Sequence, residues 1–312
     1  MGEETMDLAA DHAVEAILRD ELAREARALV AVVPVLRHLL GTDAQALVSD
    51  AILARVRGMI LDLAAQLLAV QAGHDPATRG LAAAAPSALD PLADALMADE
   101  ALLAFCHALA AEGLIAQRLH QRHAIDPVLS PLLQELIASE DPAIAGLAMS
   151  TLAAQSRFVQ AQRRMELPIA ELPAELFHRL IARAGSEGAN REALAQVQAD
   201  YDEAASRLGL LARLVAAMRR GVVAGLGLDH AGLALFASAL AAATRQPRAD
   251  GVLACHEGQT IRLALMLRAA GLSPAAIERQ LQLADPAASL PRAFAEVSAE
   301  RAAALLASGG AM

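Results

Sequence analysis

Residues 125–168 read "IDPVLSPLLQELIASEDPAIAGLAMSTLAAQSRFVQAQRRMELP". The apolar side chains of the first half recur at helical spacing and fall on one stripe: Val128, Leu129, Leu132, Leu133, Leu136 and Ile137. After the break at "SEDP" the second half continues the stripe with Ile144, Leu147, Ala148 and Leu152. The stretch predicts a helical hairpin. Its first helix is either kinked at Pro131 or begins there with Ser130 as its cap.

A looser copy of this unit, "LDPLADALMADEALLAFCHALAAEG", occupies residues 89–113. Its central "ADE" lies 41 residues before "SED", within the spacing of about 40–47 residues typical of HEAT and armadillo repeats. A third relative at 31–53, "AVVPVLRHLLGTDAQALVSDAIL", is out of period. The sequence therefore predicts an all-α protein in which degenerate HEAT-like hairpins are accompanied by additional N- and C-terminal helices.

Helix starts are indicated by Asp or Ser followed by Pro, because the side chain can cap the helix and Pro suits the first helical position. Such pairs are Asp75-Pro76, Asp90-Pro91, Asp126-Pro127, Asp141-Pro142, Ser273-Pro274 and Asp285-Pro286. Thr42 and Gln45 have the spacing of a capping box. Glycine- and proline-rich breaks divide the chain into an acidic N-terminal helical segment (1–80), a HEAT-like core (81–185) and a C-terminal helical domain (186–312).

The composition restricts the chemistry that this chain can perform. Apolar residues make up 56% of its 312 residues, charged residues 20% and aromatic residues 2%, which is typical of a globular helical protein. The sequence contains no lysine, and this excludes enzymes that need a lysine Schiff base, a P-loop lysine or a kinase-type lysine. It also lacks the GxSxG, GxGxxG and Walker motifs. We expect neither an enzyme nor a bound cofactor.

The charge and the apolar pattern indicate the compartment and the class of partner. A net charge of −10 and a pI near 5.4 argue against nucleic acid as the partner. The N-terminus is acidic from its third residue and resembles no secretory signal, so we expect a cytoplasmic protein. The longest apolar run, 221–244, is interrupted by Asp229 and His230. It predicts a loop and then a buried helix starting at Asp229, with no membrane span.

Residues 112–180, above all "QRRMELP" and "ELPAELFH", resemble a family of bacterial proteins known as domain of unknown function 2336, as does "LACHEGQTIRLALMLRAAGL" at 253–272. Members of that family are helical and related to HEAT repeats. The resemblance implies a helical-repeat fold. It implies no activity and no catalytic residues, because none is established for the family.

Two groups of residues are candidates for site chemistry. His120 and His123 lie one helical turn apart, but they have too few neighbouring ligands to predict a metal site. Cys106 lies in an apolar helix and is expected in the core. Cys255, followed by His256 and Glu257, has the better claim to reactivity. A pocket near these three residues would make the protein an enzyme or a sensor of a small ligand.

The stretch 155–168 contains the strongest candidate for a binding surface. If it continues the second helix of the hairpin, the inward stripe holds Leu152, Gln155, Phe158, Val159, Gln162 and Met165. The two glutamines would then need buried hydrogen-bond partners. The other side carries Arg157, Gln160, Arg163 and Arg164. It is either a solvated helix side or the recognition surface that helical repeats often present.

From these observations we expect a non-catalytic interaction or regulatory module. Its partner is a protein with an acidic segment, which Arg157 and Arg164 contact together. The alternatives are the enzyme or ligand sensor near Cys255 and a helical-repeat protein that binds nucleic acid, which a steep dependence of binding on salt would identify. The sequence leaves the oligomeric state and the identity of the partner open.

Overall fold

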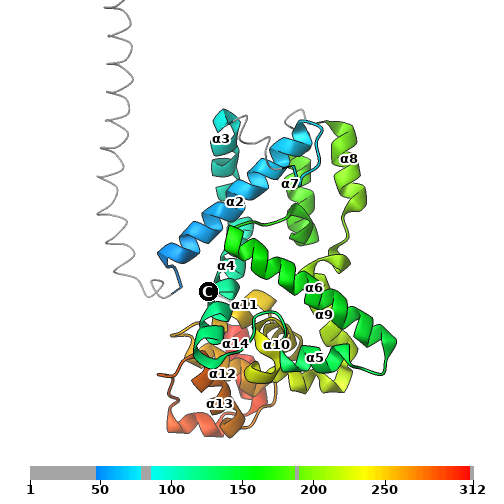
Figure 1. Cartoon of the computed structure of the whole chain (residues 1–312). Coiled ribbons are helices and arrows are strands. Elements are labelled where there is room, and N and C mark those ends of the chain that lie inside the picture. Colours follow the sequence, from blue (N-terminus) through cyan, green and yellow to red (C-terminus); the bar gives the residue numbers. More distant parts are fainter. Residues whose placement is uncertain (1–46, 79–85, 187–189, 310–312) are drawn as a thin grey trace, which may run out of the picture. The chain divides into compact units, whose positions relative to one another are not determined.

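The computed structural model describes residues 47–78, 86–186 and 190–309. The chain forms two units, Met1–Ser49 and Asp50–Met312, and the helices below belong to the second. All regular secondary structure in the described residues is helical (Figure 1). The expected all-α class is therefore confirmed. Thr42 and Gln45 lie outside the described residues.

Thirteen α-helices and four 3-10 helices follow one another in the described part of the chain. The α-helices are α2 (Asp50–Gln71), α3 (Pro86–Met97), α4 (Glu100–His123), α5 (Pro131–Ile137), α6 (Pro142–Arg164), α7 (Ala174–Ser186), α8 (Arg191–Asp200), α9 (Arg207–Met218), α10 (Leu228–Thr244), α11 (Arg248–Ala254), α12 (Thr260–Ala269), α13 (Pro274–Ala284) and α14 (Ala299–Gly309). The 3-10 helices are η3 (Ile169–Glu171), η4 (Glu203–Ala205), η5 (Arg219–Leu226) and η6 (Arg292–Glu296).

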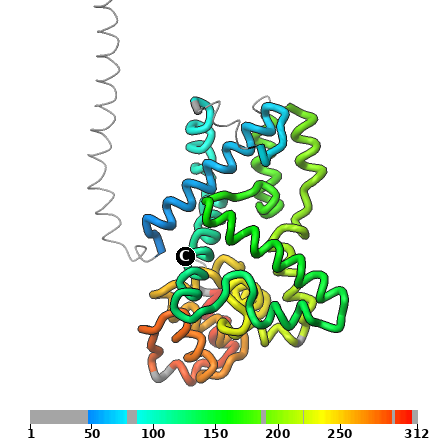
Figure 2. Tube along the Cα trace, in the orientation of Figure 1, coloured from blue at the N-terminus to red at the C-terminus, as the bar shows by residue number. Residues whose placement is uncertain are grey.

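Two hydrophobic cores share helix α4. Residues of its first half belong to one core together with residues of α2, α3, α7 and α8. Residues of its second half belong to the other core together with residues of α5, α6 and the C-terminal helices. Figure 2 shows these two groups of helices at opposite ends of α4. The first core joins residues on both sides of positions 80 and 185, where the sequence suggests segment boundaries. Because α4 takes part in both cores, the residues in its middle lie between them.

The predicted hairpin is confirmed as α5 and α6, which pack against each other. The first helix begins at Pro131. Its cap is Ser130, whose hydroxyl accepts a hydrogen bond from the Leu133 amide at 3.3 Å. Of the two alternatives for Pro131, the later helix start is thus correct. The looser copy forms α3 and α4, and Asp99 caps α4 by accepting from the amides of Ala101 and Leu102.

The helix starts predicted from Asp-Pro pairs are mostly wrong. Asp141-Pro142 begins α6 and Ser273-Pro274 begins α13. Asp75, Asp126 and Asp285 accept from the amide two residues further on, but no helix follows directly. This hydrogen bond is the same in an isolated turn and in a helix cap, so the pair alone cannot distinguish them. The remaining pair, Asp90-Pro91, lies inside α3, which begins earlier.

The apolar run at 221–244 forms a buried helix, as predicted, but α10 begins at Leu228 and the residues before it form η5 instead of a loop. In the described part of the chain, α4 is long and apolar enough to cross a membrane by length and composition alone. Half of that apolar window, 50%, is buried inside the protein. The absence of a membrane span stays a prediction.

Candidate functional site

Helix α6 places the predicted binding residues, and its ends are well defined. Asp141 caps the start by accepting from the Ala143 amide at 2.9 Å. At the other end Met165 adopts a left-handed conformation, and its amide donates back to the carbonyls of Ala161 and Gln162. Met165 was expected on the inward stripe, which is wrong. Because the helix stops before this residue, its side chain remains 41% exposed.

The outer side of α6 is formed by exposed polar residues: Arg157, Gln160, Arg163 and Arg164. We call these four residues the arginine face. At about 100° per residue they span roughly a third of the helix circumference. Arg164 forms an exposed ion pair with Glu166 at 2.9 Å. Within the described residues, Arg157 and Arg163 form no ion pair. These two guanidinium groups are therefore available to a ligand.

The inner side of α6 buries both predicted glutamines, Gln155 and Gln162, which are 4% and 5% exposed. Gln155 has the expected partners: it donates to the Pro127 carbonyl at 2.8 Å and accepts from Arg207 at 3.1 Å. Gln162 does not. Its amide nitrogen lies 3.4 Å from the sulfur of Met59, and its Oε1 has no donor among the described residues. The prediction that both glutamines face inward on α6 is confirmed. Of the two, Gln155 has strong hydrogen-bond partners among the described residues and Gln162 does not.

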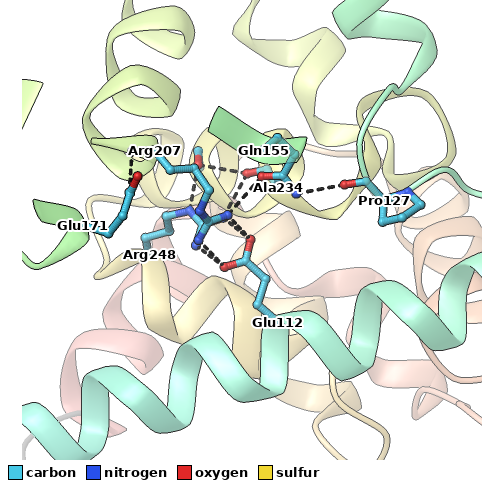
Figure 3. Close-up of polar contacts among 8 residues, drawn as sticks. Glu112, Pro127, Gln155, Glu171, Arg207, Ala234 and Arg248 are labelled. Carbon is cyan, nitrogen blue, oxygen red and sulfur yellow. Dashed lines mark hydrogen bonds and ion pairs between the residues drawn. The ribbon is translucent and has the colours of Figure 1, made fainter. Parts of the chain in front are cut away.

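Gln155 belongs to a buried polar cluster around Glu112 of α4, shown in Figure 3. Arg207 donates to both carboxylate oxygens of Glu112 at 2.8 and 2.9 Å. Arg248 also donates to both, at 2.7 and 2.8 Å. One carboxylate thus accepts four hydrogen bonds from two guanidinium groups. Bidentate pairs of this kind are among the strongest hydrogen bonds in proteins.

The charges in this cluster do not balance, because two guanidinium groups face one carboxylate. Burial by itself raises the pKa of Glu112. The charges of Arg207 and Arg248 and their hydrogen bonds lower it by more, so its pKa lies well below the usual range. Glu112 is therefore ionised at neutral pH, and the cluster carries one excess positive charge. The Arg207 guanidinium also lies 3.7 Å from the centroid of the Phe158 ring, a favourable cation–π contact.

Several helix ends hold the two arginines in place. Arg207 is the first residue of α9, directly after the cap Ser206, and its amide donates to Glu171 at 2.8 Å. Arg248 begins α11 and donates to the Ser238 hydroxyl of α10 at 2.8 Å. The cluster therefore ties α4, α6, α9, α10 and α11 together. Its first role is to join the helices around the middle of α4.

Two cavities flank the place where α6 lies against α4. The first, of about 290 Å³, we call the apolar cavity. Its walls include Phe105, Leu109, Phe158, Leu167 and Leu208, and Arg157 and Arg207 also line it. The second, of about 260 Å³, we call the polar cavity, and it is lined by Arg55, Gly113, Ala116, Gln117, His120, Gln121, Pro127, Phe158, Val159, Gln162 and Arg163. Phe158 and Gln162 border both cavities.

The histidine pair does not come together with further metal ligands. His120 is exposed at the polar cavity, and His123 is half-buried one turn further along α4. Within the described residues no group of three or more His, Cys, Asp or Glu side chains is placed to hold a metal ion. Cys106 lies in the first core, as predicted, and burial raises the pKa of its thiol to about 12.

The surroundings of Cys255 oppose its expected reactivity. The residue is buried, and its thiol donates to the Gly251 carbonyl at 3.3 Å. Burial raises the pKa of the Cys255 thiol to about 12, although the nearby positive charges of Arg118 and Arg248 act in the opposite direction. His256 contacts the Glu257 carbonyl, while the Glu257 carboxylate pairs with Arg118 and Arg122. The three residues therefore do not form a nucleophile with an adjacent base.

Comparison of the chain with protein-family models, with curated proteins and with solved structures finds no match. The resemblance to the family of unknown function therefore stays a prediction. The candidate site consists of the arginine face, the Glu112 cluster beneath it and the two cavities beside it.

Proposed function

We propose that this protein is a non-catalytic interaction or regulatory module of the cytoplasm that binds an acidic segment of a partner protein on the arginine face. The observation that carries the proposal is the contrast between two kinds of arginine. Arg207 and Arg248 are turned inward onto Glu112. Arg157 and Arg163 are exposed on one helix and form no ion pair within the described residues. A guanidinium group binds carboxylates with two parallel hydrogen bonds.

The protein's own charge makes this surface distinctive. A chain of net charge −10 repels acidic partners over most of its surface. A local positive face then both attracts an acidic segment and orients it. The excess positive charge of the Glu112 cluster lies beneath the same helix and adds to this potential. These facts favour an acidic protein segment over a nucleic acid backbone, which would need a larger basic surface.

The apolar cavity suggests a second feature of the partner. Arg157 lines it together with apolar side chains such as Phe105, Leu109 and Leu208. An apolar side chain of the partner that enters this cavity would be desolvated beside a charged contact, which is typical of residues that dominate binding energy. We therefore propose an acidic segment that carries one large apolar residue.

The HEAT-like description belongs to this proposal as well. Two consecutive hairpins, α3–α4 and α5–α6, support it, since each repeat of that class is a pair of helices. Helical repeats present the side of one helix of each pair as a binding surface. The arginine face is such a side on α6, the second helix of its hairpin.

The proposal is tested by reversing two charges of the arginine face in the full chain. The variant is Arg157→Glu with Arg164→Glu. The matched control is Arg262→Glu with Arg279→Glu, which reverses two exposed arginines on α12 and α13. Each protein is used to capture partners from the native cell extract, which are identified by mass spectrometry and rebound in purified form at increasing salt. We expect the first variant to lose its acidic partner and the control to keep it.

Both variants should fold, because exposed ion pairs such as Arg164–Glu166 contribute little to stability. Their thermal unfolding midpoints should therefore stay within a few degrees of the wild type. Equal capture of the partner by both variants would refute the proposed surface. Binding that falls steeply with salt and is shared by nucleic acid would refute the proposed class of partner.

A further inference from the structure

The polar cavity contains a cation that has no counter-charge among the described residues. Arg55 of α2 reaches into it half-buried, and its Nη2 donates to the Gln117 amide oxygen at 3.3 Å. Within the described residues no carboxylate pairs with Arg55. Burial lowers the pKa of this guanidinium, which reflects the free energy needed to remove a charge from water. Arg163 lines the same cavity from α6. The cavity is therefore electropositive.

The cavity also contains a buried acceptor, Oε1 of Gln162, for which the described part of the chain provides no donor. This atom and Nη1 of Arg55 lie beside the same point of α4, where Gly113 has no side chain. A Cβ at Gly113 would lie 2.7 Å from Arg55 Nη1 and 3.1 Å from Gln162 Oε1. Glycine inside a helix lowers its stability, but here it allows both polar groups to approach the backbone.

A donor and an acceptor thus face the same place, and the structure shows no hydrogen bond between them. A group that accepts from Arg55 and donates to Gln162 would satisfy both. A hydroxyl attached to a small anion does this, and the anion also supplies the missing negative charge. An uncharged ligand would leave Arg55 uncompensated, and a simple anion without a donor would leave Gln162 unsatisfied.

We propose that the polar cavity between α2, α4 and α6 binds a small organic anion that carries a hydroxyl beside its carboxylate or phosphate group. Arg55 and Arg163 bind the anionic group from two helices, and Gln162 accepts the hydrogen bond from the hydroxyl. The volume of about 260 Å³ limits the ligand to a small molecule. This proposal does not rest on the protein partner. Arg55, Gly113 and Gln162 lie outside the arginine face, and Arg163, which belongs to it, is unchanged in the variants that test either proposal.

The test uses probes that separate the two requirements, an anionic group and a hydroxyl, at constant ionic strength. Glycerol 3-phosphate and glycerate carry a hydroxyl beside a phosphate or a carboxylate. Propyl phosphate and propionate lack the hydroxyl, and glycerol lacks the charge. Binding to the full chain is measured by titration calorimetry and by the rise in the thermal unfolding midpoint. We expect at least one hydroxylated anion to bind about tenfold or more tightly than its analogue without a hydroxyl, and glycerol not to bind.

Single substitutions test whether the anion binds in the polar cavity. Arg55→Gln removes the half-buried cation, and we expect it to weaken binding of the hydroxylated anion by about tenfold or more. Arg57→Gln, an exposed arginine on the same helix, is the matched control and should bind as the wild type does. Gly113→Ala fills the space between the two polar groups and should also abolish binding. If it fails to fold, the Arg55 and Arg57 pair still decides the question.

Three results would overturn the proposal. The first is that no probe binds, which would mean that water alone satisfies Gln162. The second is equal binding by the Arg55 and Arg57 variants, which would indicate a general ionic effect. The third is equal binding of hydroxylated and unhydroxylated anions, which would remove the role of Gln162. None of these results depends on whether the arginine face binds a protein.

Discussion

Replacing Glu112 with Gln tests the Glu112 cluster most directly. The change keeps the shape of the side chain but removes the one carboxylate that, among the described residues, pairs with Arg207 and Arg248. The new amide group can accept hydrogen bonds at its one oxygen only. Its NH₂ group is a donor and faces the N–H donors of the guanidinium groups, with which it cannot form a hydrogen bond. Two cations then remain without a counter-charge in a site where Glu112 and Arg207 are each 2% exposed or less.

Breaking a buried ion pair by removing one partner costs about 3–5 kcal/mol. Because two arginines lose their partner here, we expect Glu112→Gln to lower the free energy of unfolding by about this amount. For a folded unit of this size that corresponds to a fall of about 6–20 °C in the thermal unfolding midpoint. Urea unfolding followed by circular dichroism at 222 nm measures the change. Glu135→Gln, at a carboxylate that is 65% exposed, is the control and should have almost no effect.

The effect should also depend on pH, with a sign that follows from the direction of the pKa shift. The pKa of Glu112 is lowered in the folded protein, whereas an unfolded Glu has a pKa of about 4.3. The stabilisation is therefore fully present above the unfolded pKa and is lost as the pH falls through the folded value. The difference between wild type and Glu112→Gln should be constant from neutral pH to about pH 5 and shrink below it. A loss below about 1 kcal/mol at pH 7 would refute the reasoning, because the arginines would then be compensated by another group.

Two further predictions concern the buried glutamines and cysteines. Gln155→Leu should lower the free energy of unfolding by about 1–3 kcal/mol, because Arg207 and the Pro127 carbonyl lose a partner. Gln162→Leu should be neutral or stabilising, because it removes an oxygen that lacks a donor within the described residues. Urea midpoints of the two variants check this contrast, and equal losses would contradict it. Burial raises the thiol pKa of both Cys106 and Cys255 to about 12. Neither thiol should therefore react with a thiol reagent at pH 8 until the protein unfolds. Fast labelling of the native protein would contradict this by showing that a thiol is accessible.

The features that the sequence predicts correctly are local ones. The stripe of apolar residues around Leu132 and Leu133 indicates the hairpin, because helical spacing is contained within a few turns. The cap Ser130 and the burial of Gln155 follow from the same pattern. The end of α6 is missed, since the left-handed conformation of Met165 has no signal in a residue other than glycine or asparagine.

The centre of the candidate site could not be predicted in the same way. Glu112 is separated by 95 residues from Arg207 and by 136 from Arg248, and a single sequence gives no information about which distant charges meet. Gly113 is a weak signal that could have been used: a glycine inside an apolar helix usually marks a close approach by another group. The close approach found there is that of Arg55 and Gln162.

Arg207 and Arg248 should not contribute equally to the free energy of unfolding. Replacing each in turn distinguishes the effect of its charge on Glu112 from the effect of its packing. Arg207→Met removes a guanidinium group that, besides pairing with Glu112, donates to Gln155 and contacts the ring of Phe158. Arg248→Met removes a guanidinium group whose side chain is 18% exposed and therefore partly hydrated. In either variant the remaining arginine balances Glu112, so each loss should be smaller than that of Glu112→Gln. We expect Arg207→Met to lower the free energy of unfolding by about 1.5–3 kcal/mol, the value of a charge-assisted hydrogen bond, and Arg248→Met by less. Urea midpoints give the order directly. If Arg248→Met were the more damaging change, Arg248 would be the main partner of Glu112, and Arg207 would serve mainly to pack α9 against Phe158 of α6.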